Sequence, residues 1–124
     1  FIADVISSDL HIGSMNGGMK DMANLLSKFL NTGLPLQDVI RRATQKPAQV
    51  IGRPELGNLS PGSEADVAVF SMREGDFGFL DVRGTKMKGT RKLEAELTLR
   101  AGRIVWDLNG IGSVMWDAVT SQAR

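Results

Sequence analysis

Cysteine and tyrosine are absent from this chain of 124 residues, and histidine occurs once, at His11. The lack of cysteine excludes disulfides, thiolate metal sites and cysteine nucleophiles. A surplus of positive charge is also missing, because 15 lysines and arginines are balanced by 14 aspartates and glutamates. This balance argues against a nucleic-acid partner. No apolar run approaches the ~20 residues of a membrane-spanning helix, so we expect a soluble, cytoplasmic protein with no membrane partner.

The first segment combines an apolar, β-favouring run with an acid. Residues 3–8 predict a strand that ends at Asp9, and His11 lies two residues further on. Residues 12–18 are rich in glycine, serine and asparagine, which is typical of a loop. A carboxylate between a buried strand and such a loop is a candidate for chemistry. Since the chain opens inside the expected strand, we expect it to be a fragment of something larger.

Helical spacing of apolar residues follows this loop. It predicts a helix over residues 19–31, with Gly33 in the left-handed conformation that ends many helices. A second apolar stripe predicts a helix with Pro35 at its first position. This helix should end near Lys46, because Pro47 disfavours helical geometry in the residue before it. Pro47 is expected to open a short third helix that reaches residue 50 or 51.

The second half has the pattern of β structure. Residues 65–70 and 77–82 predict two separate strands, and residues 84–92 predict a polar excursion. Strict alternation over residues 93–100 predicts a strand that turns back at residues 101–102 into residues 103–107, forming a hairpin. The tail from residue 109 has no clean period, and residues 114–119 are expected to form a short docking helix. One strand followed by helices cannot bury both faces of that strand, so the first third requires partners outside this chain.

An ordered set of short motifs resembles a known family. The set comprises Ile-Ser-Ser-Asp-Leu-His at residues 6–11, Ser-Lys-Phe-Leu at 27–30, Asp-Val-Ile at 38–40, Ala-Thr at 43–44 with Lys-Pro-Ala at 46–48, and the stretch 56–70. Together they are similar to the C-terminal part of the metal-dependent amidohydrolases, most of all the amidohydrolase and deacetylase branch near dihydroorotases and D-aminoacylases. The resemblance runs from about residue 4 to residue 107.

The resemblance implies an α/β fold: the C-terminal fragment of a β/α (TIM) barrel followed by part of a small antiparallel β domain. Residues 3–9 would be the eighth barrel strand, residues 19–52 the closing helices, and residues 65–107 the share of the small domain. We therefore expect three parts: residues 1–52 with the last barrel strand and its helices, residues 53–108 in the small domain, and a tail over residues 109–124.

The resemblance also implies a chemistry. Family members hydrolyse amide, cyclic amide or N-acyl C–N bonds with water activated by one or two metal ions, usually zinc. Asp9 matches the last-strand aspartate, which contacts the metal and takes a proton from the attacking water, and catalysis in barrels lies at this end of the strands. The other family ligands match nothing in this chain. One carboxylate and one imidazole cannot hold a catalytic zinc, so the chain alone should bind none and be inactive.

Each candidate residue has a structural alternative. Asp9 can be an N-cap or loop acid that accepts backbone hydrogen bonds, and His11 can be a surface or hydrogen-bonded histidine instead of a substrate contact. Asn16, with the two glycines after it, can bring backbone close to a substrate or form a flexible turn. Asp66 is expected to anchor a turn through backbone hydrogen bonds.

Two functions from different classes remain open. In the first, this chain is the C-terminal part of an amidohydrolase that acts on a small-molecule amide, and its partner is the missing N-terminal barrel segment or a second copy of itself. In the second, it is a non-catalytic assembly module of helices and β structure.

Overall fold

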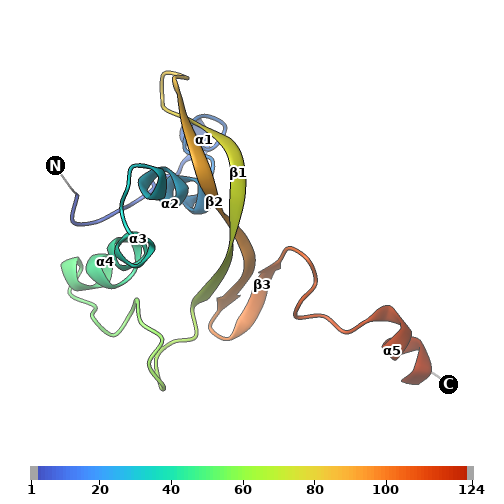
Figure 1. The fold of residues 1–124 in the computed structure, drawn as a ribbon. Helices are drawn as coiled ribbons and strands as arrows, with labels where there is room; N and C mark the ends of the chain where they lie inside the picture. Colours follow the sequence, from blue (N-terminus) through green and yellow to red (C-terminus); the bar gives the residue numbers. More distant parts are fainter. Residues whose placement is uncertain (1–2, 123–124) are drawn as a thin grey trace. The chain divides into compact units, whose positions relative to one another are not determined.

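The computed structural model describes residues 3–122, and its contacts divide the chain into two units. The first, unit 1, comprises Phe1–Ser63 and Ser71–Glu94, and the second, unit 2, comprises Glu64–Phe70 and Ala95–Arg124. In chain order (Figure 1) the elements are α1 (Ile12–Met15), α2 (Met22–Asn31), α3 (Leu36–Ala43), α4 (Gln45–Val50), β1 (Val67–Leu80), β2 (Lys86–Arg100), β3 (Arg103–Asp107) and α5 (Trp116–Gln122). Among these helices of the described chain, none is long and apolar enough to cross a bilayer.

The expected strand over residues 3–8 does not form, and the segment belongs to neither helix nor strand. A strand needs a ladder of hydrogen bonds to a neighbouring strand. The N–H of Ile6 donates instead to the carbonyl of Arg42 in α3, at 2.9 Å. The prediction is therefore wrong for this chain, although Ile6 itself is buried at 3% exposure, as an apolar strand residue would be.

The helices form close to the expected places, with three corrections. The expected loop over residues 12–18 contains the one-turn helix α1. Helix α2 begins at Met22, later than expected, because the Asp21 carboxylate accepts the N–H of Asn24 at 2.7 Å and caps the helix there. The helix expected to run from Pro35 to near residue 46 begins at Leu36, with Pro35 as its N-cap, and ends at Ala43. Helix α4 begins before Pro47, which is tolerated because the first N–H groups of a helix have no intrahelical partner. Gly33 has φ +101°, which confirms the left-handed cap.

The β region of unit 1 is longer than expected. β1 joins the two expected strands into one, and β2 includes most of the segment expected to be a polar excursion. Residues 87, 89, 91 and 93 are half-buried or buried while their neighbours at 88 and 90 are exposed, which is a strand pattern. The buried member Gly89 carries no apolar side chain, and a Cβ there would lie 2.6 Å from the Asn31 side chain and 2.7 Å from the ring of Phe79. A glycine buried for close packing leaves no hydrophobic signal in the sequence.

Polar side chains of α2 cover an edge of β2 within unit 1. The Ser27 hydroxyl accepts the N–H of Leu93 at 2.9 Å, and the Asn31 amide accepts the N–H of Thr90 at 3.0 Å and donates to the carbonyl of Arg91 at 2.7 Å. Since β3 pairs only with residues 97–100 of β2, these side chains satisfy strand groups that lack a partner strand. The buried apolar side chains of the described residues also lie in unit 1: Ile6, Leu26, Leu30, Val39, Ala48, Phe79 and Leu93.

Unit 2 contains the expected hairpin. β2 and β3 pair antiparallel, with Leu97 opposite Asp107 and Arg100 opposite Arg103. Ala101 and Gly102 both have positive φ, +49° and +76°, as the two central residues of a type I′ turn require. The Asp66 carboxylate accepts the N–H of Ala101 at 2.8 Å, which confirms that Asp66 anchors a turn. The short helix expected over residues 114–119 is present as α5, shifted to Trp116–Gln122.

Candidate functional site

Asp9 lies at the end of the extended segment and has an unusual backbone. Its φ is +47°, in the left-handed region that few non-glycine residues adopt, and the residue is exposed. Its carbonyl accepts a hydrogen bond from the Ser14 hydroxyl at 3.1 Å. Within residues 3–122, its carboxylate has neither a hydrogen bond nor an ion pair. The segment therefore turns sharply at Asp9 and leaves its carboxylate exposed.

His11, rather than Asp9, caps the helix that follows. Its Nδ1 accepts the N–H of Gly13 at 3.0 Å, and the Ser14 hydroxyl accepts the N–H of His11 at 3.0 Å, which is a reciprocal capping box around α1. In a neutral ring, an accepting Nδ1 places the proton on Nε2. The structure thus favours the hydrogen-bonded alternative for His11, and its exposed Nε2 remains available to a ligand.

Asn16 ends α1 as its C-cap and is exposed, and Gly17 and Gly18 follow it. The close approach that glycine permits is made to the protein itself. A Cβ on Gly18 would lie 2.5 Å from the carbonyl oxygen of Leu80 and 2.6 Å from that of Asp81, so no other residue fits there. Gly18 is therefore packed against the end of β1, whereas Gly17 is exposed and has room for a side chain.

The segment that carries these three residues is held at both ends. Before Asp9, the Arg42 guanidinium donates to the carbonyl of Ala3, and the Arg42 carbonyl accepts the N–H of Ile6. After Asn16, the Asn24 amide donates to the carbonyls of Gly18 at 3.0 Å and Met19 at 2.9 Å. Asp9, His11 and Asn16 thus lie on one exposed stretch between two anchored ends. Neither Arg42 nor Asn24 carries a sequence signal for this role, because their partners are backbone carbonyls.

The residues of this chain do not by themselves fit a metal. Across the described residues there is no group of three or more histidines, aspartates or glutamates arranged to hold an ion. A catalytic zinc takes about three protein ligands and keeps one open position. Asp9 and His11 together offer two side-chain donors, and the Nδ1 of His11 is already engaged with Gly13.

A cleft of about 360 Å³ lies elsewhere in unit 1, between α2 and the β1–β2 turn. None of the three candidate residues lines it. Its walls are mainly apolar and comprise Leu25, Lys28, Phe29, Thr32, Phe79, Leu80, Asp81, Thr85, Lys86 and Met87. The structure therefore does not bring the sequence-predicted residues and this cleft together.

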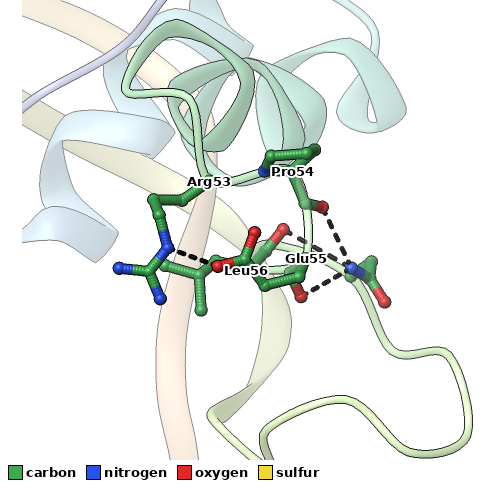
Figure 2. A network of polar contacts seen from close by, with 5 residues as sticks. Arg53, Pro54, Glu55 and Leu56 are labelled. Atoms are coloured by element: carbon green, nitrogen blue, oxygen red, sulfur yellow. Dashed lines mark hydrogen bonds and ion pairs between the residues drawn. The ribbon is translucent and has the colours of Figure 1, made fainter.

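The segment after α4 is organised by one amide side chain. Asn58 Nδ2 donates to the carbonyl of Glu55 at 3.0 Å, and its Oδ1 accepts from the Ser63 hydroxyl at 2.7 Å. Figure 2 shows Arg53 and Glu55 facing each other, and the hydrogen bond from the Arg53 guanidinium lowers the pKa of the Glu55 carboxyl. Gly57 has φ +69° and packs against the backbone of Thr44, so that a Cβ on Gly57 would lie 2.5 Å from the Thr44 carbonyl oxygen. These contacts give a structural reason for the sequence of residues 56–63.

Comparison with known proteins assigns the chain to a family. Residues 4–106 match the model described as "Amidohydrolase family". A deacetylase of Brucella anthropi is 36% identical over 89 residues, which cover 72% of this chain and 22% of that protein. A crystal structure of a dihydroorotase superposes with a TM-score of 0.77 at 29% identity, covering 86% of this chain and 29% of that one. A crystal structure of an adenine deaminase superposes with a TM-score of 0.78 at 25% identity, covering 85% and 28%.

The chain is much shorter than the proteins that it matches. The chain spans about a fifth to under a third of each of these proteins. The family match ends at residue 106, so residues 107–122, which include α5, lie outside the matched region. With a family model that matches most of its length, and with relatives in both sequence and structure, the chain belongs to the amidohydrolase family.

Proposed function

We propose that this chain is the C-terminal segment of an enzyme that hydrolyses amide, cyclic amide or N-acyl C–N bonds. Membership of the amidohydrolase family supports a hydrolase, and the deacetylase and dihydroorotase among its relatives support C–N bonds in carbonyl compounds. The non-catalytic assembly module has no comparable support. In this proposal residues 3–9 become the eighth strand of a β/α barrel once the neighbouring strands are supplied, and residues 19–52 are its closing helices.

The proposal extends to the three expected parts of the chain. Residues 1–52 belong to the barrel, residues 53–108 to the small β domain, and residues 109–124 form the tail. The solved relatives, in which this chain covers under a third of the length, support a large remainder that supplies the other barrel strands. That remainder, and not the present chain, would hold most of the ligands for zinc or another divalent metal, whose chemistry is to polarise the carbonyl and acidify water.

Asp9 is the residue of this chain to which we assign catalysis. The single observation that carries the assignment is its exposed carboxylate, without a partner in the described structure, on a left-handed residue at the end of an anchored extended segment. Such a carboxylate accepts a proton as water adds to the substrate carbonyl carbon, and then gives the proton to the nitrogen that leaves as the C–N bond breaks. The charge of Asp9 is restored at the end of the cycle. His11 and Asn16, on the same exposed stretch, are assigned to substrate contact.

The test is Asp9→Asn in the complete enzyme. We expect the fold to be kept and turnover to fall by ~10² or more, the usual range for loss of a general acid–base group. Asp76→Asn is the matched control, because Asp76 is an exposed acid of β1 whose carboxylate makes neither a hydrogen bond nor an ion pair within the described residues. Turnover within twofold of the control would return Asp9 to a structural role and refute the proposal.

A further inference from the structure

The ammonium group of Lys28 joins two distant parts of unit 1. Lys28 lies on α2 and is half-buried. Its Nζ donates to the carbonyl of Gly18, 10 positions away, and to the carbonyl of Leu80, 52 positions away, at 2.6 Å each. Gly18 ends the stretch that carries the candidate residues, and Leu80 ends β1. One side chain therefore bridges the candidate loop and the β1–β2 turn.

The chemistry of this bridge suits a clamp. An ammonium has three N–H donors and no acceptor, so a single Nζ can hold two carbonyl oxygens at once. Hydrogen bonds from a charged donor are shorter and stronger than neutral ones, which agrees with the two 2.6 Å contacts. Lys28 takes part in none of the ion pairs found among the described residues, so its charge serves these carbonyls and not an acid.

Two neighbouring contacts limit the movement of the same point. Asn24, one helical turn before Lys28, donates to the same Gly18 carbonyl at 3.0 Å. Gly18 also lies so close to the carbonyl oxygens of Leu80 and Asp81 that even a Cβ would overlap them. The backbone at Gly18 is therefore fixed both by hydrogen bonds and by shape, two residues after Asn16.

We propose that Lys28 is a positioning residue for the active site. It holds the loop of residues 11–18 against the β1–β2 turn and thereby sets the place of His11 and Asn16 relative to Asp9. This inference rests on the proposed function, because it assigns substrate contact to that loop. It adds that the β1–β2 turn, far from the loop in sequence, supports the loop and thereby contributes to substrate affinity.

The experiment uses Lys28→Met in the complete enzyme, which keeps an unbranched side chain one atom shorter than lysine and removes all donors. The matched control is Lys88→Met, since Lys88 is an exposed lysine of β2. The first measurement is backbone amide exchange over residues 12–20 without substrate, which is independent of catalysis. We expect exchange there to rise about tenfold in Lys28→Met and to stay unchanged in the control.

The second measurement separates KM from kcat. We expect KM to rise about tenfold in Lys28→Met with kcat within threefold, because Asp9 is untouched while the contacts to substrate lose their place. A purely structural loss would lower the active fraction and hence kcat, and leave KM alone. Lys28→Arg should restore most of both effects, because it keeps a charged donor that reaches more than one oxygen. Lys28→Gln, a milder variant with a single amide group, should give intermediate values.

Two outcomes overturn the inference: exchange over residues 12–20 equal to that of the Lys88→Met control, or an unaltered KM. If Lys28→Met does not fold, an unaltered KM in Lys28→Gln has the same force. The proposed function fails separately, through full turnover in Asp9→Asn. The Lys28 variants therefore test the positioning role, and Asp9→Asn separately tests the catalytic role.

Discussion

Asn31 offers a direct measure of how α2 covers the edge of β2. Its Oδ1 accepts the N–H groups of Thr90 at 3.0 Å and Arg91 at 3.3 Å, and its Nδ2 donates to the carbonyl of Arg91 at 2.7 Å. Asn31→Ala removes these partners. Thr90 is exposed and regains a hydrogen bond from water, whereas the two groups of Arg91 are partly buried. At about 1 kcal/mol for each of those two groups, local stability should fall by about 2 kcal/mol.

The assay is amide exchange at residues 90–93 of β2 in the complete enzyme. A loss of about 2 kcal/mol corresponds to a rise of roughly 30-fold in the local opening constant. Gln49→Ala is the matched control, because Gln49 is an exposed amide on α4. Asn31→Asp keeps the acceptor and turns a second oxygen toward the Arg91 carbonyl, so it should raise exchange at least as much. Exchange in Asn31→Ala equal to that of the control would show that the strand edge does not depend on this side chain.

Two further predictions concern the chain on its own. The isolated 124 residues should retain no stoichiometric zinc after dialysis and show no amidase activity, since the described residues contain no set of three ligands; one tightly held zinc per chain by atomic absorption would contradict this. The isolated chain should also self-associate, because exposed apolar side chains such as Ile12 at 86%, Ile51 at 66% and Trp116 at 77% form association surfaces. A monomeric mass by light scattering, together with a sharp cooperative unfolding transition on heating, would count against the missing-partner proposal.

The parts of the fold that could be predicted depend on local signals. The hairpin of β2 and β3 was visible in its alternation and its Ala101–Gly102 turn, and α2 in its apolar stripe and Gly33. The resemblance to amidohydrolases was likewise carried by short ordered motifs, and the family match confirms it.

The parts that were missed depend on distant partners. The β character of residues 86–92 was hidden because its buried centre is Gly89, whose need for closeness is set by Asn31 and Phe79. The strand expected at residues 3–8 does not form, because Ile6 donates its N–H to Arg42 of α3 instead of to a neighbouring strand. In the candidate site, the roles of Asp9, His11 and Asn16 stay predictions from the sequence. The contacts of Arg42 and Lys28 could not be predicted, because their partners are backbone carbonyls, which leave no pattern in the sequence. The capping box of His11 and Ser14 had a local signal that was overlooked.

Unit 1 is interrupted in the sequence, and this has a consequence for how the protein is made. Leu93 follows Ser27, its hydrogen-bond partner in α2, by 66 positions. At ~5–20 residues per second, a ribosome adds those 66 residues in roughly 3–13 s. During that delay α2 lacks the strand that it covers, so the face that β2 buries in the finished protein is open to other contacts. A messenger RNA truncated between the codons of Ser27 and Leu93 would yield a chain in which α2 has no β2 to pack against. Such a product is suited to recognition by quality-control proteases.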